Sequence, residues 1–129
     1  MLSACAIAAS PPSATLAGTA WQVHSVNGRQ APANSDYSVR FEDGGSISAR
    51  FGCNSIGGHY AIAGSTLTIG DLMQTLMGCP EPATTFESQG SAVFNRPMAM
   101  SRSESDRVPY EYLSLKNQAG EIILMRRTF

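Results

Sequence analysis

The sequence carries little charge and no run of either sign. Only 15% of its 129 residues are charged, with nine Lys and Arg against ten Asp and Glu. Proteins that bind nucleic acid use a basic patch or stripe to neutralise phosphates, and this sequence offers none. We therefore expect neither DNA nor RNA as a partner.

Long apolar segments are also missing. A membrane-spanning helix needs about 20 consecutive apolar residues, and no run in the chain approaches that length. The length fits one domain with a single core. Contact with a membrane would therefore depend on an anchor.

Reactive side chains are few, with three Cys and two His in the whole chain. The spacings Cys-x-x-Cys and His-x-x-x-His do not occur, and neither does Gly-x-Ser-x-Gly or a Gly-rich phosphate loop that ends in Lys. Those patterns carry the common metal, nucleophile and nucleotide sites. We therefore expect no enzymatic activity and no cofactor.

The first residues supply a candidate anchor. Leu2-Ser3-Ala4-Cys5 resembles the bacterial lipobox, in which the Cys is lipidated and becomes the mature N-terminus. A secretory signal would place a basic start and an apolar stretch of about 7–15 residues before it, whereas here only Met1 precedes Leu2. The alternative is a chance N-terminus of small residues.

The residues after Cys5 are small and rich in Pro and Ser up to Thr15, as in a flexible tether. We expect lipidation at Cys5, a tether over residues 1–15 and a folded domain over residues 16–129. A lipidated, exported chain would lie in the periplasm. By the enterobacterial sorting rule, Ala6 in place of Asp favours the outer membrane.

Most of the remaining chain alternates apolar and polar residues in short runs, which is typical of strands with one buried face. Turn residues at 43–45, 64–65 and 117–120 separate pairs of such runs and predict three antiparallel hairpins. The polar stretch 101–106 is interpreted as a solvated strand edge or loop. The runs are centred on Trp21, Val39–Phe41, Ile47–Phe51, Tyr60–Ile62, Leu67–Ile69, Tyr112–Lys116 and Glu121–Arg127.

One segment is predicted to be helical. Thr84 and Glu87 have the spacing of a capping box, and Pro97 should end the helix. The fold class is therefore α+β and mainly antiparallel β, with a strongly curved, half-barrel-like sheet wrapped around one α-helix. The expected apolar face comprises Ala83, Phe86, Gly90, Val93 and Phe94.

Three segments together resemble the META/HslJ-like family. The family pattern is a Gly-Thr-x-Trp start with a later Val-Asn-Gly, a Gly-Cys-Asn loop that runs to Gly-x-Tyr, and Thr-x-Met-x-Cys-Pro before a helix. Segment 96–108 is longer and more polar than the pattern, which leaves the strand number there open. The matching residues are Gly18, Thr19, Trp21, Asn27, Gly28, Gly52, Cys53, Asn54, Gly58, Tyr60, Thr75, Met77, Cys79 and Pro80.

The resemblance implies a domain of the bacterial envelope, often lipid-anchored, in a heat-shock or antibiotic-stress context and without established enzymatic activity. We accordingly expect a monomeric binding or interaction module. Its partner would be an unidentified protein or apolar ligand of the envelope. A pilot-like role in stabilising an outer-membrane complex is an alternative that rests on analogy between folds.

The cysteines leave a second set of alternatives open. If Cys5 is lipidated, Cys53 and Cys79 are the remaining pair, and an oxidising compartment favours a disulfide between them. The competing interpretations are a Cys-based redox role of this pair, a metal site made of the two with His59 and, as an optional further ligand, His24, and a Cys–His nucleophile. Asn54 is expected to fix its loop, or with Ser55 to line a ligand-binding mouth.

Overall fold

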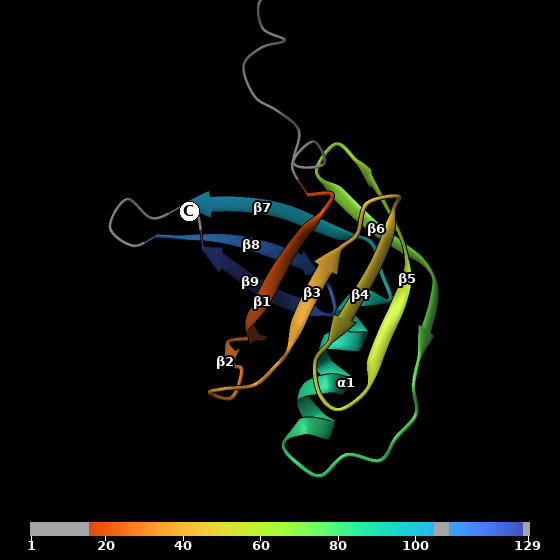
Figure 1. Cartoon of the computed structure of the whole chain (residues 1–129), viewed down its shortest axis with the longest axis vertical. Helices are drawn as coiled ribbons and strands as arrows, with labels where there is room; N and C mark the ends of the chain where they lie inside the picture. Colours follow the sequence, from red (N-terminus) through yellow and green to blue (C-terminus); the bar gives the residue numbers. More distant parts are fainter. Residues whose placement is uncertain (1–15, 105–108, 128–129) are drawn as a thin grey trace, which may run out of the picture.

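The structure is a computed structural model of the chain, and it describes residues 16–104 and 109–127. This part of the chain forms nine β-strands and one α-helix (Figure 1). The helix, α1 (Ala83–Phe94), lies between β6 and β7 in chain order. The strands are β1 (Thr19–Val26), β2 (Arg29–Gln30), β3 (Ser38–Phe41), β4 (Ser46–Arg50), β5 (Ser55–Ala63), β6 (Thr66–Gln74), β7 (Met98–Glu104), β8 (Tyr110–Asn117) and β9 (Gly120–Arg127).

Antiparallel pairing closes the sheet into a barrel. The strand order is β1-β3-β4-β5-β6-β7-β8-β9, and β9 pairs back onto β1, with Val26 opposite Ile122. The short β2 pairs with the end of β1. The mainly antiparallel β class is confirmed, and the half-barrel-like sheet is corrected to a closed one. The contact that closes the ring joins the first and last strands, which no local sequence pattern reports.

The three expected hairpins are present as β3–β4, β5–β6 and β8–β9. The expected solvated strand edge is confirmed for 101–104: these residues belong to β7 and pair with β8, whereas β7 pairs with β6 only at Met98 and Ala99, and most of their side chains are exposed. Residues 105 and 106 lie outside the described residues. The alternation begun by Met98 and Met100 places the half-buried Arg102 on the same side of the strand as these two residues.

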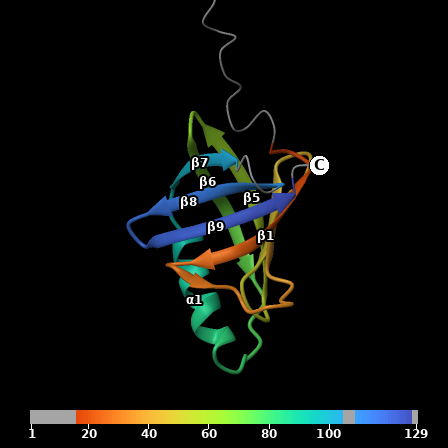
Figure 2. The same cartoon turned by 90° about the vertical axis from the view of Figure 1, so that its left-hand side faces the viewer.

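The helix lies at the lower end of the molecule in both views, below β7, β8 and β9 (Figures 1 and 2). Its position is confirmed, but its expected capping box is wrong. The helix begins after Pro82, whose own side chain makes no cap, and the carboxylate of Glu81 accepts from the amide of Thr85 in the first turn at 3.1 Å. The hydroxyl of Thr84 instead donates to the carbonyl of Cys79, and the carboxylate of Glu87 binds Asn54.

The core draws buried apolar side chains from all eight barrel strands and from one face of α1. Five aromatic side chains are buried in this core, and Tyr60 is half-buried against Phe41 at its margin. The five buried ones are Trp21, Phe41, Phe51, Phe86 and Phe94.

Cys5 and the expected tether lie outside the described residues, so lipidation and an envelope location stay predictions. Within the described part, no helix has the length and apolar character needed to cross a membrane.

Candidate functional site

Two of the sequence motifs meet beside the helix. Residues 52–54 follow β4, and residues 75–80 connect β6 to α1. The β5–β6 hairpin brings them together, because its open ends, Ser55 and Thr75, are hydrogen-bonded. The amide of Thr75 donates to the carbonyl of Ser55 at 3.1 Å, and the amide of Ser55 donates to the hydroxyl of Thr75 at 3.0 Å.

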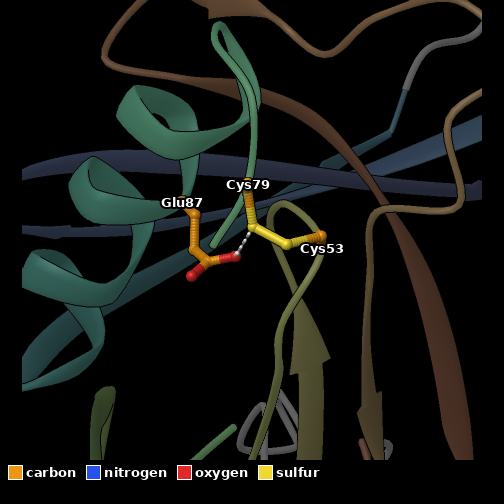
Figure 3. Close-up of side chains that lie close together, drawn as sticks. All are labelled: Cys53, Cys79 and Glu87. Atoms are coloured by element: carbon orange, nitrogen blue, oxygen red, sulfur yellow. Dashed lines mark hydrogen bonds between the residues drawn. A yellow bond between two sulfur atoms is a disulfide. The ribbon is translucent and has the colours of Figure 1, made fainter. Parts of the chain in front are cut away.

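A disulfide joins Cys53 to Cys79, with the two Cα atoms 6.0 Å apart (Figure 3). The structure thus confirms the pairing expected from the sequence. Both cysteines are half-buried, and the carbonyl oxygen of Met77 lies 4.0 Å from Cys53 Sγ and 3.6 Å from Cys79 Sγ. The bond ties the segment that enters α1 to the loop after β4.

Asn54 is the polar centre of this region and is 3% exposed. Its side-chain oxygen accepts from the amide of Met77 at 2.7 Å and from the hydroxyl of Thr75 at 2.8 Å. Its side-chain nitrogen donates to the carbonyl of Met77 at 3.0 Å and to Glu87 Oε2 at 2.8 Å. Asn54 therefore fixes two connections and the helix at once, and the expectation that it holds its loop is confirmed.

Glu87, which the sequence placed in a capping box, belongs to this cluster instead, together with Gln74, which sequence analysis missed. Glu87 is 8% exposed, and its carboxylate accepts from the amide of Asn54 at 2.9 Å and from Gln74 Nε2 at 2.9 Å, besides the Asn54 side chain. Oε1 lies 3.9 Å from Cys79 Sγ, the contact dashed in Figure 3. Helical spacing from Ala83 and Gly90 could have placed Glu87 on the inner face.

Two glycines allow the helix to approach this close. A Cβ at Gly52 would lie 2.7 Å from Glu87 Oε1 and 2.8 Å from Glu87 Cβ. A Cβ at Gly90 would lie 2.6 Å from the ring of Phe51. Since real Cβ atoms do not come this near to other heavy atoms, both positions exclude a side chain unless their neighbours shift.

An exposed apolar surface adjoins the disulfide. Met73, Leu76 and Met77 are 75%, 91% and 58% exposed, and we call them the apolar ridge. The backbone of the ridge is fixed through the bonds that Thr75 and Met77 make to Asn54. A pocket of about 130 Å³ opens beside it between β6 and the end of α1, lined by Ile56, Leu72, Gln74, Ser91, Phe94 and Asn95.

The first motif lies elsewhere and serves the barrel. Trp21 is buried, and its indole N–H donates to the hydroxyl of Thr19 at 2.8 Å. Asn27 and Gly28 form the turn after β1 with positive φ angles of 53° and 80°. The side chain of Asn27 accepts from the amide of Glu121 at 2.8 Å, which ties that turn to β9.

The remaining motif positions pack against their neighbours. Gly18 has a φ of 79° and lies against Asp43, and a Cβ at Gly58 would meet the carbonyl of Gly70 at 2.8 Å. Burial raises the pKa of Tyr60, and the nearby carboxylate of Asp43 raises it further. The carbonyl of Pro80 accepts from the amide of Thr84 at 3.4 Å.

A second polar cluster stands inside the barrel on β7, β8 and β9. Glu111, 5% exposed, accepts from Arg102 Nε at 2.6 Å and from Arg126 Nε at 2.9 Å. The guanidinium carbon of Arg126 lies 4.7 Å and that of Arg102 5.8 Å from the ring centre of Trp21. Sequence analysis missed this group, although each member continues the buried phase of its strand.

The two histidines do not join the cysteines. Nδ1 of His59 lies 3.6 Å from Oδ2 of Asp71 on the outside of β5, and the ring of His24 packs edge-on against that of Tyr112. In the described residues, the one group of at least three metal-binding side chains is Cys53, Cys79 and Glu87. The expected ligand set with His59 and His24 is therefore wrong. The alternating strands turn both rings away from the disulfide.

The fold and this region define a small, closed antiparallel barrel that carries one helix at its end and a disulfide where that helix begins. The META domain family model matches residues 14–128, and the chain belongs to that family. A comparison with curated proteins gave no match.

Two structures solved by NMR are similar in fold. One, of a protein from Burkholderia xenovorans, has a TM-score of 0.65 and 24% sequence identity, over 93% of this chain and 91% of the other. A second has a TM-score of 0.69 and 18% identity, over 90% of this chain and 94% of the other. At these identities the likeness shows the fold alone.

Proposed function

We propose that this META domain is a non-enzymatic binding module of the bacterial envelope, and that the apolar ridge is its contact surface. The observation that carries this is the exposure of Met73, Leu76 and Met77 on a connection whose backbone is held by Asn54 and a disulfide. Apolar side chains gathered on a fixed backbone are typical of interaction sites. We expect the partner to be a protein or apolar ligand of the envelope in a stress context.

The rigidity of the ridge supports a binding role. A surface whose backbone is already ordered loses little conformational entropy when a partner docks, so more of the contact energy appears as affinity. The amide and carbonyl of Met77 are both bonded to Asn54.

The state of the cysteines supports the non-enzymatic part. A disulfide leaves Cys53 and Cys79 without the thiolate that nucleophilic catalysis requires. Both imidazoles lie away from them, so neither is placed to act as a general base there.

Site-specific photo-crosslinking tests the contact surface. A photoreactive amino acid replaces Leu76 in the protein expressed in a bacterial host with its upstream sequence, and replaces exposed Ser101 on β7 as the control. We expect a discrete adduct at position 76 that is absent at 101 and is lost when Met73 and Met77 are changed to Ser. Equal labelling at both positions, or none at 76, would contradict the proposed surface.

We further propose that Cys5 is lipidated and holds the domain at the periplasmic side of the outer membrane. Intact mass of the same preparation should show an added diacyl or triacyl group. Cys5→Ser should remove that mass and move the protein from the membrane to the soluble periplasmic fraction. An unlipidated wild-type chain in the cytoplasm would refute the envelope assignment.

A further inference from the structure

We propose that the reduced form of this protein binds Zn²⁺ through the thiolates of Cys53 and Cys79 and the carboxylate of Glu87. The region then has two forms, a disulfide without metal and a metal-bound dithiol. This inference is independent of the binding role of the apolar ridge.

The positions of the three donors carry the proposal. The two sulfurs and a carboxylate oxygen of Glu87 all lie within 4.8 Å of one another, and the cysteine Cα atoms are 6.0 Å apart. Tetrahedral zinc, with bonds of about 2.3 Å to sulfur and about 2.0–2.2 Å to oxygen, holds its ligands roughly 3.5–3.8 Å apart. Once the sulfur–sulfur bond is broken, small side-chain rotations would bring the three donors to that spacing.

Glu87 is held as a metal-binding carboxylate usually is. Asn54 and Gln74 supply three N–H groups to its oxygens, and Oε1 remains directed at the sulfurs, 3.9 Å from Cys79 Sγ. Hydrogen-bond donors of this kind orient a carboxylate and fix the oxygen that it presents to a metal. The carbonyl of Met77, within 4.0 Å of both sulfurs, is a candidate for the fourth position, which water would otherwise fill.

The chemistry of the donor set selects the metal. Thiolates with a carboxylate suit zinc, whereas Ca²⁺ and Mg²⁺ prefer oxygen alone. Reduction transfers two electrons and two protons from two molecules of a thiol to the disulfide, giving Cys53–SH, Cys79–SH and one thiol-derived disulfide. Zn²⁺ then replaces the two thiol protons, which leave to solvent, so that two thiolates and the buried Glu87 carboxylate face the dication.

The test uses the full chain with Cys5→Ser, so that the third cysteine cannot contribute a thiolate. The protein is reduced with a phosphine, freed of reductant under nitrogen, and titrated with Zn²⁺ against a chromophoric chelator. Co²⁺ serves as the spectroscopic probe. We expect one metal per chain, a thiolate-to-cobalt charge-transfer band and the visible bands of a tetrahedral site.

Variants separate the carboxylate from the thiols. Glu87→Gln should weaken zinc binding at least tenfold, and Gln74→Ala, which removes one supporting donor, by about tenfold. Glu81→Gln at the exposed start of the helix is the matched control and should leave affinity unchanged. Equal affinity in the Glu87 and Glu81 variants would overturn the proposal.

The reduced Cys5→Ser chain, without a further change, gives the second criterion, with near-ultraviolet circular dichroism as the readout of folding. A folded dithiol that binds zinc supports the proposal, and so does an unfolded one that folds when zinc is added. A reduced chain that takes up no metal, folded or not, overturns it. So does a cobalt complex without the thiolate band.

Discussion

Asn54 and Glu87 show how two side chains can hold together segments that are distant in the chain. Asn54 lies between β4 and β5, and Glu87 lies on α1. Asn54 binds Met77 in the connection after β6, and Glu87 binds Gln74 at the end of β6. These bonds are partly buried, and Asn54 and Glu87 are themselves buried, so losing one partner leaves a polar group unsatisfied in a region with little access to water. The stability of this corner therefore depends on individual polar atoms.

Asn54→Ala should lower the free energy of unfolding by about 2–3 kcal/mol, because Thr75, Met77 and Glu87 would all lose a partner. Urea denaturation followed by circular dichroism measures the change. The exposed Asn95, changed to Ala, is the control and should stay within about 0.5 kcal/mol of wild type. Equal effects at the two positions would mean that the network contributes no stability.

Tyr60 should make folding sensitive to alkaline pH. Burial, with Asp43 nearby, raises its pKa above the usual 10.0, so the folded state disfavours the phenolate. Stability is retained below the unfolded pKa and falls as pH rises towards the folded one, because the unfolded chain loses its proton first. Unfolding curves measured below and above the pKa of the unfolded tyrosine should show a steeper loss of stability at alkaline pH for wild type than for Tyr60→Phe. Parallel losses would count against this assignment.

The helix depends on close contact with the barrel more than on its own propensity. Its Gly90 lies over the ring of Phe51, which in turn packs edge-on against Phe94 at 5.1 Å. Glycine in a helix costs about 1 kcal/mol relative to alanine. At position 90, close packing on Phe51 therefore outweighs helix propensity.

Gly90→Ala should therefore destabilise the protein, by about 1–2 kcal/mol after its gain in helix propensity, because the added methyl overlaps the ring of Phe51. Ser88→Ala on the exposed face of the same helix should be neutral or slightly stabilising. The double variant with Phe51→Leu should lose less stability than the two single changes combined. The stabilities are measured by thermal or chemical denaturation. If the losses of the two single variants simply add up in the double variant, Gly90→Ala does not act through a clash with Phe51.

The strands β7, β8 and β9 are joined by an ionic group as well as by their backbones. Glu111→Ala should lower the free energy of unfolding by about 3–5 kcal/mol, since Arg102 and Arg126 would lose a buried counter-charge. The exposed Glu42→Ala provides the comparison and should change stability little. Chemical denaturation of both variants measures the difference, and a small effect at Glu111 would show that the arginines find other partners.

For the whole molecule, the disulfide closes a long loop across the end of the barrel. Cys53 and Cys79 are 26 residues apart, and cross-linking a loop of that size should stabilise the fold by about 3 kcal/mol through the entropy of the unfolded chain. The double variant Cys53→Ala with Cys79→Ala should show this loss in urea denaturation under metal-free conditions. An unchanged midpoint would mean that Asn54 and Glu87 hold the corner without the bond.

The sequence alone determined the elements and much of the motif region. Alternation gave the β3–β4, β5–β6 and β8–β9 hairpins, helical spacing gave α1, and the pairing of Cys53 with Cys79 followed once Cys5 was set aside. These features depend on neighbours in the chain or on counting one residue type, which a sequence displays directly.

Only the tertiary structure decided how the barrel closes and what its polar residues do. The pairing of β1 with β9, the direction of the Glu87 carboxylate towards Asn54 and the meeting of Arg102, Glu111 and Arg126 all join distant segments. A polar residue at a buried position interrupts the regular spacing of apolar residues that predicts strands and buried helix faces. Its role is set by the partner that the fold brings to it, and that partner is not written beside it in the chain.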